Sequence, residues 1–263
     1  MNLDKKVVLI SGASSGMGKE IAKILAKENC KLALFSRRKT KLKEICENLK
    51  EKNIECIYDK CDVKNKEDIK KAVEFTYDKF GQIDIAILAA GILIPNPLQS
   101  YDSDIIKNSI DINFLGNVYF IEFLLKIMKK QKSGTLAVTS TLPDKRGVPG
   151  WGAYGASKAA LSWFLESLRA EAKHDYNINI ITIKPGSVET PMIEDYHRKG
   201  SISSKKAAEI IINGIKKGKK IIQFPTLQVL MIRTMDRFPV IVYDNLDIDL
   251  QKGDGYPQVE EIE

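Results

Sequence analysis

A short apolar run, a glycine-rich turn and an amphipathic helix follow one another at the start of this chain. Residues 7–10, Val-Val-Leu-Ile, are continuously apolar, which is typical of a strand buried on both faces. The segment 11–18 contains three glycines and leads into a predicted amphipathic helix over 19–27. Glycines allow a tight turn and let a phosphate approach the backbone amides at a helix N-terminus. The junction therefore favours a nucleotide-binding turn over a turn that is merely tight.

Strands and helices alternate along most of the remaining sequence. The further strands that we expect lie at 32–35, 54–58, 84–88, 134–140, 178–183 and 221–225. The further helices that we expect lie at 65–79, 103–130, 151–173 and 205–217, with a lysine-rich helix that ends near residue 52. This alternation, without hairpin signals, predicts an α/β fold: a single-domain, Rossmann-like, doubly wound parallel sheet of about seven strands with helices on both faces. Ligands bind at the carboxyl ends of such strands, so the site residues should meet at one edge of the sheet.

The 263 residues are expected to form one dinucleotide-binding catalytic domain over 1–243. It would include a substrate-loop region at 186–204 and an apolar extension at 221–243, followed by a polar, acidic and loosely ordered tail at 244–263. Within the extension, residues 227–242 are apolar at irregular spacing. We favour packing of this segment in the core or against another subunit; cover for a lipophilic substrate and contact with a lipid surface are the alternatives.

The formal net charge of +7 comes from 41 basic and 34 acidic residues. Because the lysines are scattered through predicted helices, they indicate solvated helix faces and not a nucleic-acid-binding surface. No run approaches the ~20 apolar residues that a membrane span requires. The N-terminus has no apolar signal-peptide core. We therefore expect a cytoplasmic protein that binds no nucleic acid.

The cysteines show neither a C-x-x-C spacing nor a nearby histidine, so we expect no metal site. They are Cys30, Cys46, Cys56 and Cys61. Their spacing fits a reducing compartment in which no disulfides form.

The second strand ends at Ser36-Arg37-Arg38. At this position of a dinucleotide fold an acidic residue would accept the ribose 2′-hydroxyl, whereas an arginine would pair with a 2′-phosphate. No acidic residue stands at this strand end, and two arginines follow it, which favours NADP(H) over NAD(H). The alternative is that Arg38 only begins the next helix.

Tyr154 and Lys158 stand four residues apart in a predicted helix. Four residues are about one helical turn, so the two side chains project from the same face. A phenol has a reference pKa of about 10, and a nearby ammonium lowers that pKa. The pair therefore predicts a proton donor and acceptor for a carbonyl oxygen.

Five motifs in this order resemble those of the short-chain dehydrogenase/reductase family, and the resemblance extends over about residues 5–192. They are Ser11-Gly12-x-x-x-Gly16-x-Gly18, Asp62-Val63, Asn113, Tyr154-x-x-x-Lys158 and Pro185-Gly186 with Thr190. With the patterns above, the resemblance implies cofactor contacts from Ser11, Gly12, Ser14, Ser15, Gly16, Met17, Gly18, Arg37, Arg38, Asp62, Val63, Ala90, Gly91, Tyr154, Lys158, Pro185, Gly186, Val188 and Thr190.

Two segments depart from the family pattern. Leu88-Ala89-Ala90-Gly91 stands where the family usually has Asn-Asn-Ala-Gly. Counting back from Tyr154 by the family's spacing reaches Thr141 and not Ser140. A threonine hydroxyl can make the same hydrogen bonds. We favour Thr141 as the catalytic hydroxyl, with Ser140 as the alternative.

The resemblance implies an NADP(H)-dependent oxidoreductase that interconverts a ketone or aldehyde and an alcohol, with a bulky hydrophobic substrate as one option. Tyr154 would carry the proton and Lys158 would lower its pKa and hold the nicotinamide ribose. The hydroxyl upstream would hold the substrate oxygen, and Asn113 would support a water chain through Lys158. The resemblance also implies a homodimer or homotetramer assembled through helices 103–130 and 151–173. The alternative function is a non-catalytic regulatory or scaffold protein that binds the cofactor on the same fold.

Overall fold

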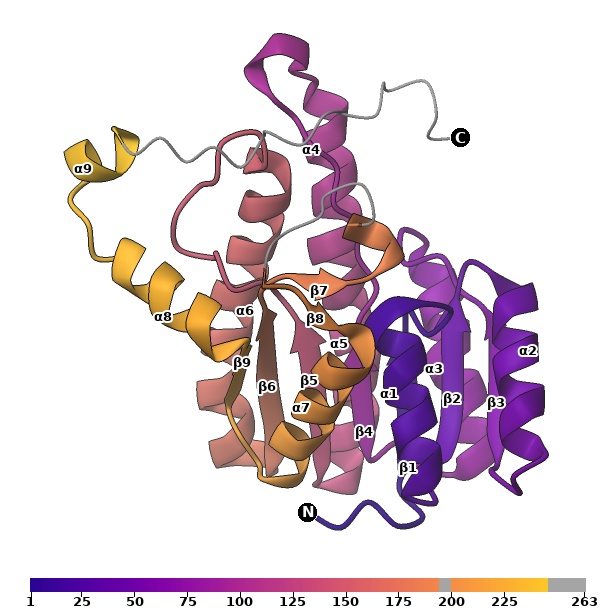
Figure 1. Ribbon diagram of the computed structural model, residues 1–263. Coiled ribbons are helices and arrows are strands. Elements are labelled where there is room, and N and C mark those ends of the chain that lie inside the picture. Colours follow the sequence, from indigo (N-terminus) through magenta and orange to yellow (C-terminus); the bar gives the residue numbers. More distant parts are fainter. Residues whose placement is uncertain (194–199, 246–263) are drawn as a thin grey trace.

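Seven parallel strands form one sheet in the part of the chain that the structure, a computed structural model, describes: residues 1–193 and 200–245 (Figure 1). Their order is β3-β2-β1-β4-β5-β6-β9. The strands are β1 Val7–Ser11, β2 Lys31–Ser36, β3 Cys56–Lys60, β4 Ile85–Leu88, β5 Gly134–Thr139, β6 Ile178–Pro185 and β9 Ile221–Phe224. The chain moves outward from β1 in one direction and from β4 in the other, which leaves a crevice at their carboxyl ends. The predicted doubly wound parallel sheet is confirmed.

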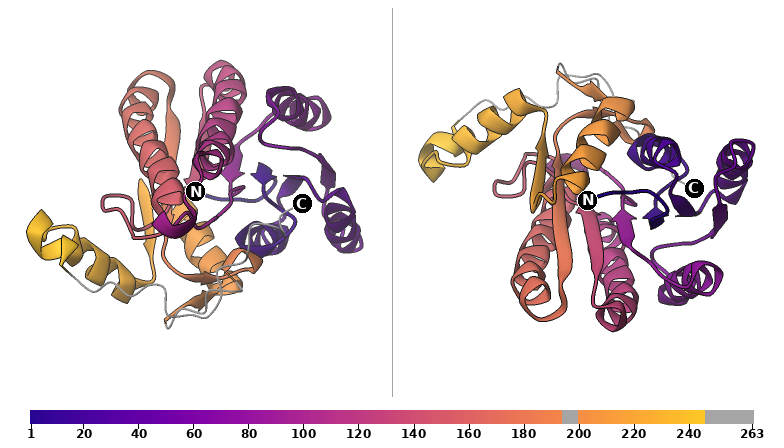
Figure 2. Two further views of the ribbon diagram at one scale, coloured as in Figure 1. Left: turned by 90° about the horizontal axis from the view of Figure 1, so that it is seen from above. Right: turned by 90° about the horizontal axis from the view of Figure 1, so that it is seen from below.

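Helices cover both faces of the sheet, as the end-on views show (Figure 2). One face carries α1 Gly16–Lys27, α2 Lys39–Lys50 and α7 Ser204–Lys216. The other carries α3 Lys66–Phe80, α5 Gly116–Gln131 and α6 Gly152–Tyr176. Strand β1 shows why its sequence is apolar throughout, since Val8 and Ile10 pack in the first core and Leu9 in the second.

The helix predicted at 103–130 is interrupted in the structure. It consists of α4 Ser103–Ile110, a π-helical segment Asp111–Leu115 and α5. The N–H of Gly116 donates to the carbonyl oxygen of Asp111, five residues earlier. The side-chain amide of Asn117 donates to the carbonyl oxygen of Asn113 at 2.8 Å. Periodicity alone could not predict this break, because the apolar residues continue on both sides of it.

The segment after β6 contains short elements that the sequence did not reveal. They are β7 Val188–Glu189, a 3₁₀ turn Pro191–Ile193, β8 Ile202–Ser203, α8 Thr226–Met235 and α9 Val240–Asp244. Strands β7 and β8 pair in parallel as a second, small sheet. Part of the expected loop and short helix at 193–204 lies outside the described residues. Most of the expected tail at 244–263 also lies outside them.

Six large apolar side chains of α8 and α9 are exposed in the single chain. They are Leu227, Leu230, Met231, Val240, Ile241 and Val242. The favoured expectation was packing of 227–242 in the core or against another subunit, and its core part is wrong for these side chains, because the helices extend away from the sheet (Figure 1). Packing against another subunit, cover for a lipophilic substrate and contact with a lipid surface stay predictions.

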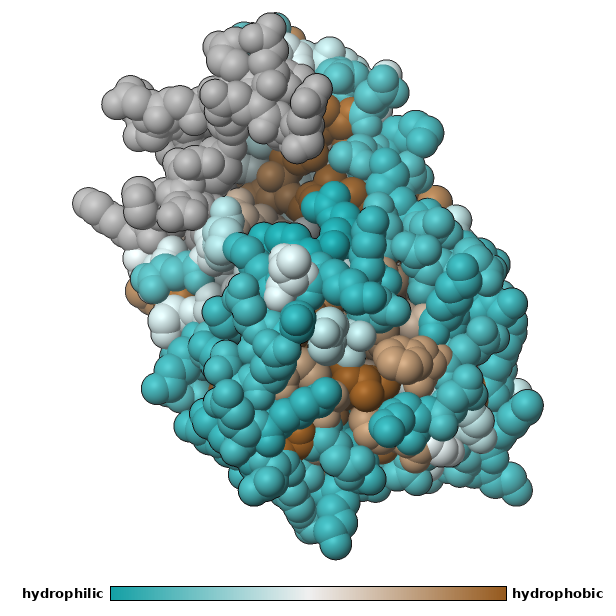
Figure 3. All heavy atoms as spheres, turned by 90° about the vertical axis from the view of Figure 1, so that its right-hand side faces the viewer, coloured by the Kyte–Doolittle hydropathy of each residue, from teal (hydrophilic) through white to brown (hydrophobic). Residues whose placement is uncertain are grey.

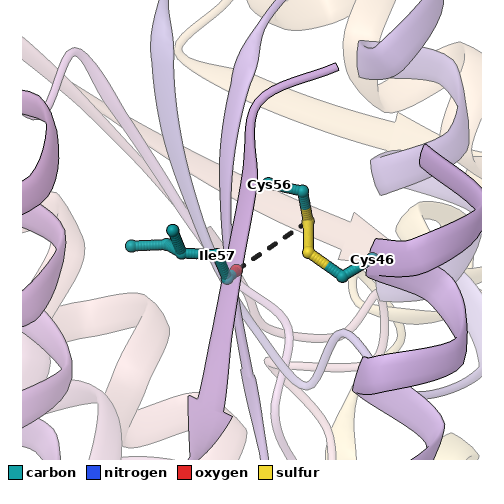
Figure 4. The surroundings of a disulfide bond; sticks show 3 residues. All are labelled: Cys46, Cys56 and Ile57. Carbon is teal, nitrogen blue, oxygen red and sulfur yellow. Dashed lines mark hydrogen bonds between the residues drawn. A yellow bond between two sulfur atoms is a disulfide. The ribbon is translucent and has the colours of Figure 1, made fainter. Parts of the chain in front are cut away.

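Cys46 and Cys56 form a disulfide between α2 and the start of β3 (Figure 4). Their Cα atoms are 5.6 Å apart, and both side chains are buried. The expectation that no disulfide forms is wrong for this pair, because the turn after α2 folds β3 back against that helix. Cys30 and Cys61 are free, and burial raises the pKa of each thiol to about 12.

The face on the side of α2 and α3 is mainly hydrophilic (Figure 3). The lysines of α2 are exposed to solvent, as the scattered basic residues indicated. None of the helices within 1–193 and 200–245 is long and apolar enough to cross a bilayer.

Candidate active site

The turn between β1 and α1 has no room for a side chain at two of its glycines. Gly12 has a φ angle of +70°, and a Cβ atom there would lie 2.7 Å from the backbone nitrogen of Ala90. A Cβ atom on Gly18 would lie 2.4 Å from the carbonyl oxygen of Gly12. The side chain of Ser15, at the N-cap of α1, makes no capping hydrogen bond. The turn thus lies against the end of β4 and leaves the first amides of α1 for an anion.

Arg38 joins the end of β2 to this turn. Its Nε and Nη2 atoms donate to Ser14 Oγ at 3.1 and 2.9 Å, and Nη2 also donates to Ser15 Oγ at 2.6 Å. Arg37 is exposed beside it. Two cations therefore lie where an adenosine ribose meets the second strand of a dinucleotide fold.

Asp62 and Val63 lie just beyond β3. A carboxylate oxygen of Asp62 accepts a hydrogen bond from the backbone N–H of Lys64 at 3.0 Å, while Val63 packs against the apolar core. On the neighbouring strands, the hydroxyl of Ser11 accepts from the N–H of Ala90 at 3.4 Å. This bond links the ends of β1 and β4 where the family's usual asparagines are missing.

Asn113 lies inside the π-helical segment and is fully buried. Its side-chain oxygen accepts from the N–H of Ile92 at 2.8 Å, and its amide donates to the carbonyl oxygen of Ile92 at 3.0 Å. The amide also donates to Ser157 Oγ at 3.0 Å. The side chain therefore fastens the segment after β4 to α6.

Tyr154 and Lys158 lie one turn apart on α6 and line the same cavity. The ammonium of Lys158 donates to the carbonyl oxygen of Thr139 at 2.7 Å. Lys158 is almost completely buried, and this burial lowers its pKa to about 8. A pKa of about 8 leaves the side chain mainly charged at neutral pH.

Ser140 and Thr141 differ in how their hydroxyls are used. Ser140 Oγ donates to the carbonyl oxygen of Lys158 at 2.9 Å and lies 2.7 Å from Ser162 Oγ. The Thr141 hydroxyl makes no hydrogen bond to another described residue, and Thr141 lines the cavity. The Ser140 hydroxyl is thus occupied in joining β5 to α6.

A cavity of about 160 Å³ opens at the carboxyl ends of β4, β5 and β6. The predicted site residues that line it are Met17, Gly91, Ser140, Thr141, Tyr154, Lys158, Pro185, Gly186, Val188 and Thr190. The other predicted residues lie outside this lining, along the glycine turn, at the ends of β2, β3 and β4, or behind Gly91. A Cβ atom on Gly91 would lie 2.9 Å from Asn113 Oδ1 and 3.4 Å from Lys158 Nζ.

Several cavity-lining residues were not predicted from the sequence. Ile92, Arg146 and Trp151 come from connecting segments, and Gln228 and Ile232 come from α8. Gln228 accepts from the N–H of Ser187 at 2.8 Å and donates to the carbonyl oxygen of Gly200 at 3.0 Å. In the sequence, Arg146 and Trp151 stand between the strand-end hydroxyls of Ser140 and Thr141 and Tyr154, and this position was the one sign that they could line the site.

A family model described as short chain dehydrogenase matches residues 6–200, more than half of the chain. The protein belongs to the short-chain dehydrogenase/reductase family. An uncharacterised oxidoreductase of Listeria monocytogenes is 38% identical over 195 residues, which cover 74% of this short-chain dehydrogenase/reductase and 79% of the relative. The 11-beta-hydroxysteroid dehydrogenase-like 3 protein of Arabidopsis thaliana is 36% identical over 237 residues, which cover 86% of this chain and 75% of that one.

Solved structures share the fold of this short-chain dehydrogenase/reductase. A short-chain dehydrogenase/reductase from Burkholderia phymatum, in complex with NAD, has a TM-score of 0.82 at 19% identity, over 89% of this chain and 93% of the other. An alcohol dehydrogenase from the archaeon Thermococcus sibiricus, complexed with 5-hydroxy-NADP, has a TM-score of 0.75 at 25% identity, over 83% of this chain and 94% of the other. The two neighbours differ in the cofactor they bind. No cluster of potential metal ligands occurs among the described residues.

Proposed function

We propose that this short-chain dehydrogenase/reductase interconverts a ketone or aldehyde and the corresponding alcohol with NADP(H), with Tyr154 as the proton donor and acceptor. The observation that carries the proposal is that Tyr154, Thr141 and the buried Lys158 line one cavity at the carboxyl edge of the sheet. The relative from Arabidopsis is named for hydroxysteroids, which supports a bulky apolar substrate.

The residues around the cavity fit a bound dinucleotide. Gly12 lets the β1–α1 turn lie against the end of β4, and the side chain of Ser15 leaves the first amides of α1 uncapped for a phosphate. The nicotinamide cofactor supplies hydride transfer when it is bound. Pro185, Gly186, Val188 and Thr190 would hold its nicotinamide end, and Lys158 its ribose.

Proton transfer is the task that the proposal gives to Tyr154. The charged ammonium of Lys158, one helical turn away, would lower the pKa of the phenol towards neutrality. Thr141 would direct its hydroxyl to the substrate oxygen, because the Ser140 hydroxyl already bonds to α6. Asn113 would keep Ile92 and α6 in position around the reacting atoms.

The Tyr154→Phe variant tests the proton donor. We expect turnover to fall by about 10²–10⁴-fold because the phenyl ring cannot donate a proton. NADPH affinity should change less than about twofold, since the ring stays in place. Steady-state oxidation of NADPH with a panel of ketones, aldehydes and hydrophobic 3-oxo compounds measures the first, and fluorescence titration the second. Tyr176→Phe, at the far end of α6, is the matched control.

Substantial residual turnover in Tyr154→Phe would contradict the assignment. A wild-type protein that binds NADPH but converts no compound of the panel would instead favour the alternative, a cofactor-binding regulatory or scaffold protein.

The preference for NADP(H) is supported by Arg37 and Arg38 and by the lack of an acidic residue at the tip of β2. A charge-assisted bond to the 2′-phosphate predicts that Arg38→Met raises the KM for NADPH by about 10–100-fold. The KM for NADH should change less than about threefold, because NADH lacks that phosphate. An equal rise of the KM for NADPH and for NADH would show that Arg38 only holds Ser14 and Ser15 in position through its hydrogen bonds.

The proposal includes a homodimer or homotetramer formed through α4, α5 and α6. Trp163, on the face of α6 turned away from the sheet, is 82% exposed in the single chain, which supports contact with a second copy there. A cytoplasmic location is also part of the proposal, and fractionation of cells with an antibody to the protein tests it.

A further inference from the structure

Arg146 lies in the segment that connects β5 to α6 and lines the cavity. Among the described residues of the lining, Arg146 and Lys158 are the charged ones, and both are cations. Lys158 belongs to the proton-transfer end, beside Thr139 and one turn from Tyr154. Arg146 therefore adds a second positive charge to a wall that is otherwise largely apolar, with side chains such as Ile92, Leu93, Val148 and Ile232.

The guanidinium of Arg146 is held in place by neutral groups. Its Nη2 atom donates to the carbonyl oxygen of Phe238, and its Cζ atom lies 5.0 Å from the centre of the Tyr243 ring. The Tyr243 hydroxyl in turn donates to the carbonyl oxygen of Gly147 at 2.7 Å. These contacts fix the position of the guanidinium and leave its charge unneutralised.

Two of the nearby carboxylates, Asp144 and Asp236, are already paired with other cations, and Asp244, next to Tyr243, forms no ion pair with Arg146. Arg233 lies 3.3 Å from Asp144 and 2.7 Å from Asp236, and Lys184 also pairs with Asp144. This cluster has two cations and two carboxylates and is therefore balanced by itself. No carboxylate of the described residues forms an ion pair with Arg146. A half-buried charge beside an apolar cavity is ordinarily paired, so the missing anion is expected from a ligand.

We propose that the substrate carries a carboxylate that pairs with Arg146, together with an apolar body and the carbonyl or alcohol that reacts at Tyr154. The inference rests on the proposed function and names the substrate class of the same cavity. The carbonyl oxygen of Phe238 already occupies one edge of the guanidinium, so one pair of N–H donors remains for a ligand. Such a pair matches the two oxygens of a planar, singly charged carboxylate better than a phosphate.

The test compares two compounds that differ mainly in charge, 4-acetylbenzoate and 4-acetylbenzamide, and a flexible pair, 5-oxohexanoate and 5-oxohexanamide. Wild-type kcat/KM should favour the carboxylate of at least one pair by about 10–100-fold. In Arg146→Gln the ratio of kcat/KM for the carboxylate to kcat/KM for the amide should fall to about one, because the KM for the carboxylate rises. The kcat/KM for the amide should change less than about threefold. Glutamine keeps a donor for the Phe238 carbonyl, so the local fold is retained.

Two further variants separate charge from structure. Arg146→Lys keeps the charge and should retain part of the preference, whereas Arg237→Gln, at an exposed arginine beyond α8, should retain all of it. Equal losses for acid and amide in Arg146→Gln would overturn the inference, because they would show that Arg146 only anchors the C-terminal segment. A wild-type protein without preference for either carboxylate would overturn it as well.

Calorimetric titration of the same four compounds, with and without NADPH, gives a second readout that does not need turnover. Tighter binding of a carboxylate than of its amide, lost in Arg146→Gln, supports the inference even where no compound is converted. Absence of turnover together with such binding would count against the proposed function alone. Equal binding of acid and amide would count against the inference alone.

Discussion

At the scale of single residues, the buried ammonium of Lys158 has the clearest energetic consequence. It is surrounded by the ends of β4 and β5 and by α6, and its only described hydrogen-bond acceptor is the carbonyl oxygen of Thr139. Taking a charged amine out of water is unfavourable, and this cost is what lowers its pKa to about 8. The protein thus gives up stability to keep a cation beside Tyr154.

The stability of the cofactor-free protein should therefore depend on pH through Lys158. Below about pH 8 the lysine is protonated in the folded and unfolded states, and the cost of burial is fully present. Between about pH 8 and 10.5 the folded state has lost the proton and the unfolded state still binds it, so the free energy of unfolding rises with pH. The full gain is about 3 kcal/mol.

Urea unfolding of the wild type and of Lys158→Met, measured from pH 7 to pH 10.5, isolates this contribution. The unfolding free energy of the wild type minus that of Lys158→Met should rise with pH. The comparison is needed because Cys30 and Cys61 act in the opposite sense: their raised pKa values contribute stability below about pH 9 that is lost as the pH rises towards about 12. A difference that stays constant with pH would contradict the burial of a charged Lys158.

Sequence reasoning at this scale worked where one helix or one turn holds the residues together. Tyr154 and Lys158 needed only the helical period, and Gly12 and Gly18 needed only the junction of β1 with α1. Arg146 and Gln228 could not be predicted in this way, since they line one cavity through contacts between α8 and the segment 140–151, which lie far apart in the sequence. Ser140 and Thr141 both line the cavity, and which hydroxyl is available to a substrate depends on the bonds of Ser140 to Lys158 and Ser162, which spacing alone does not reveal.

At the scale of elements, the strands and most helices were predicted because most strands contain a short apolar run and the helices have their own period. The exceptions have a common cause. Asn113 bonds the π-helical segment Asp111–Leu115 to Ile92 and Ser157, and β7 pairs with β8 across the segment between them, so neither follows from a local pattern. The disulfide between α2 and β3 belongs to the same group.

The Cys46–Cys56 disulfide closes a loop with a sequence separation of 10 residues. Restricting the unfolded chain by such a loop is worth about 3 kcal/mol in the loop-entropy model. We expect Cys46→Ser to lower the free energy of unfolding by about this amount, and reduction with a phosphine to have the same effect on the wild type. Thiol titration of the denatured, unreduced protein should find two free thiols; four would contradict the pairing.

At the scale of the whole molecule, helix α6 has two separate roles in the proposed function. Its N-terminal part carries Tyr154 and Lys158 to the cavity, and its middle exposes Trp163. If Trp163 lies in a subunit contact, assembly would hold the proton-transfer residues in place as well.

Trp163→Ser should shift the protein towards the monomer by at least about tenfold in dissociation constant, because large aromatic side chains dominate interface energies. Sedimentation velocity over a range of protein concentrations measures the shift. Tyr77→Ser, at a 41%-exposed aromatic residue of α3, is the control and should leave the assembly unchanged. An unaltered assembly in Trp163→Ser would place the contact on another surface, such as α8 and α9.

The π-helical segment determines where the side chain of Asn113 lies. Each hydrogen bond of such a segment closes over five residues instead of four, so the turn holds about one residue more than an α-helical turn. Removing one residue there would let the segment close as an ordinary α-helical turn, with α4 and α5 in nearly the same relative orientation. The wide turn that places Asn113 against Ile92 and Gly91 would then be lost. The geometry of this corner thus depends on the number of residues in the helix as much as on their identity, and a single-codon deletion would undo it while leaving every side chain near the cavity unchanged.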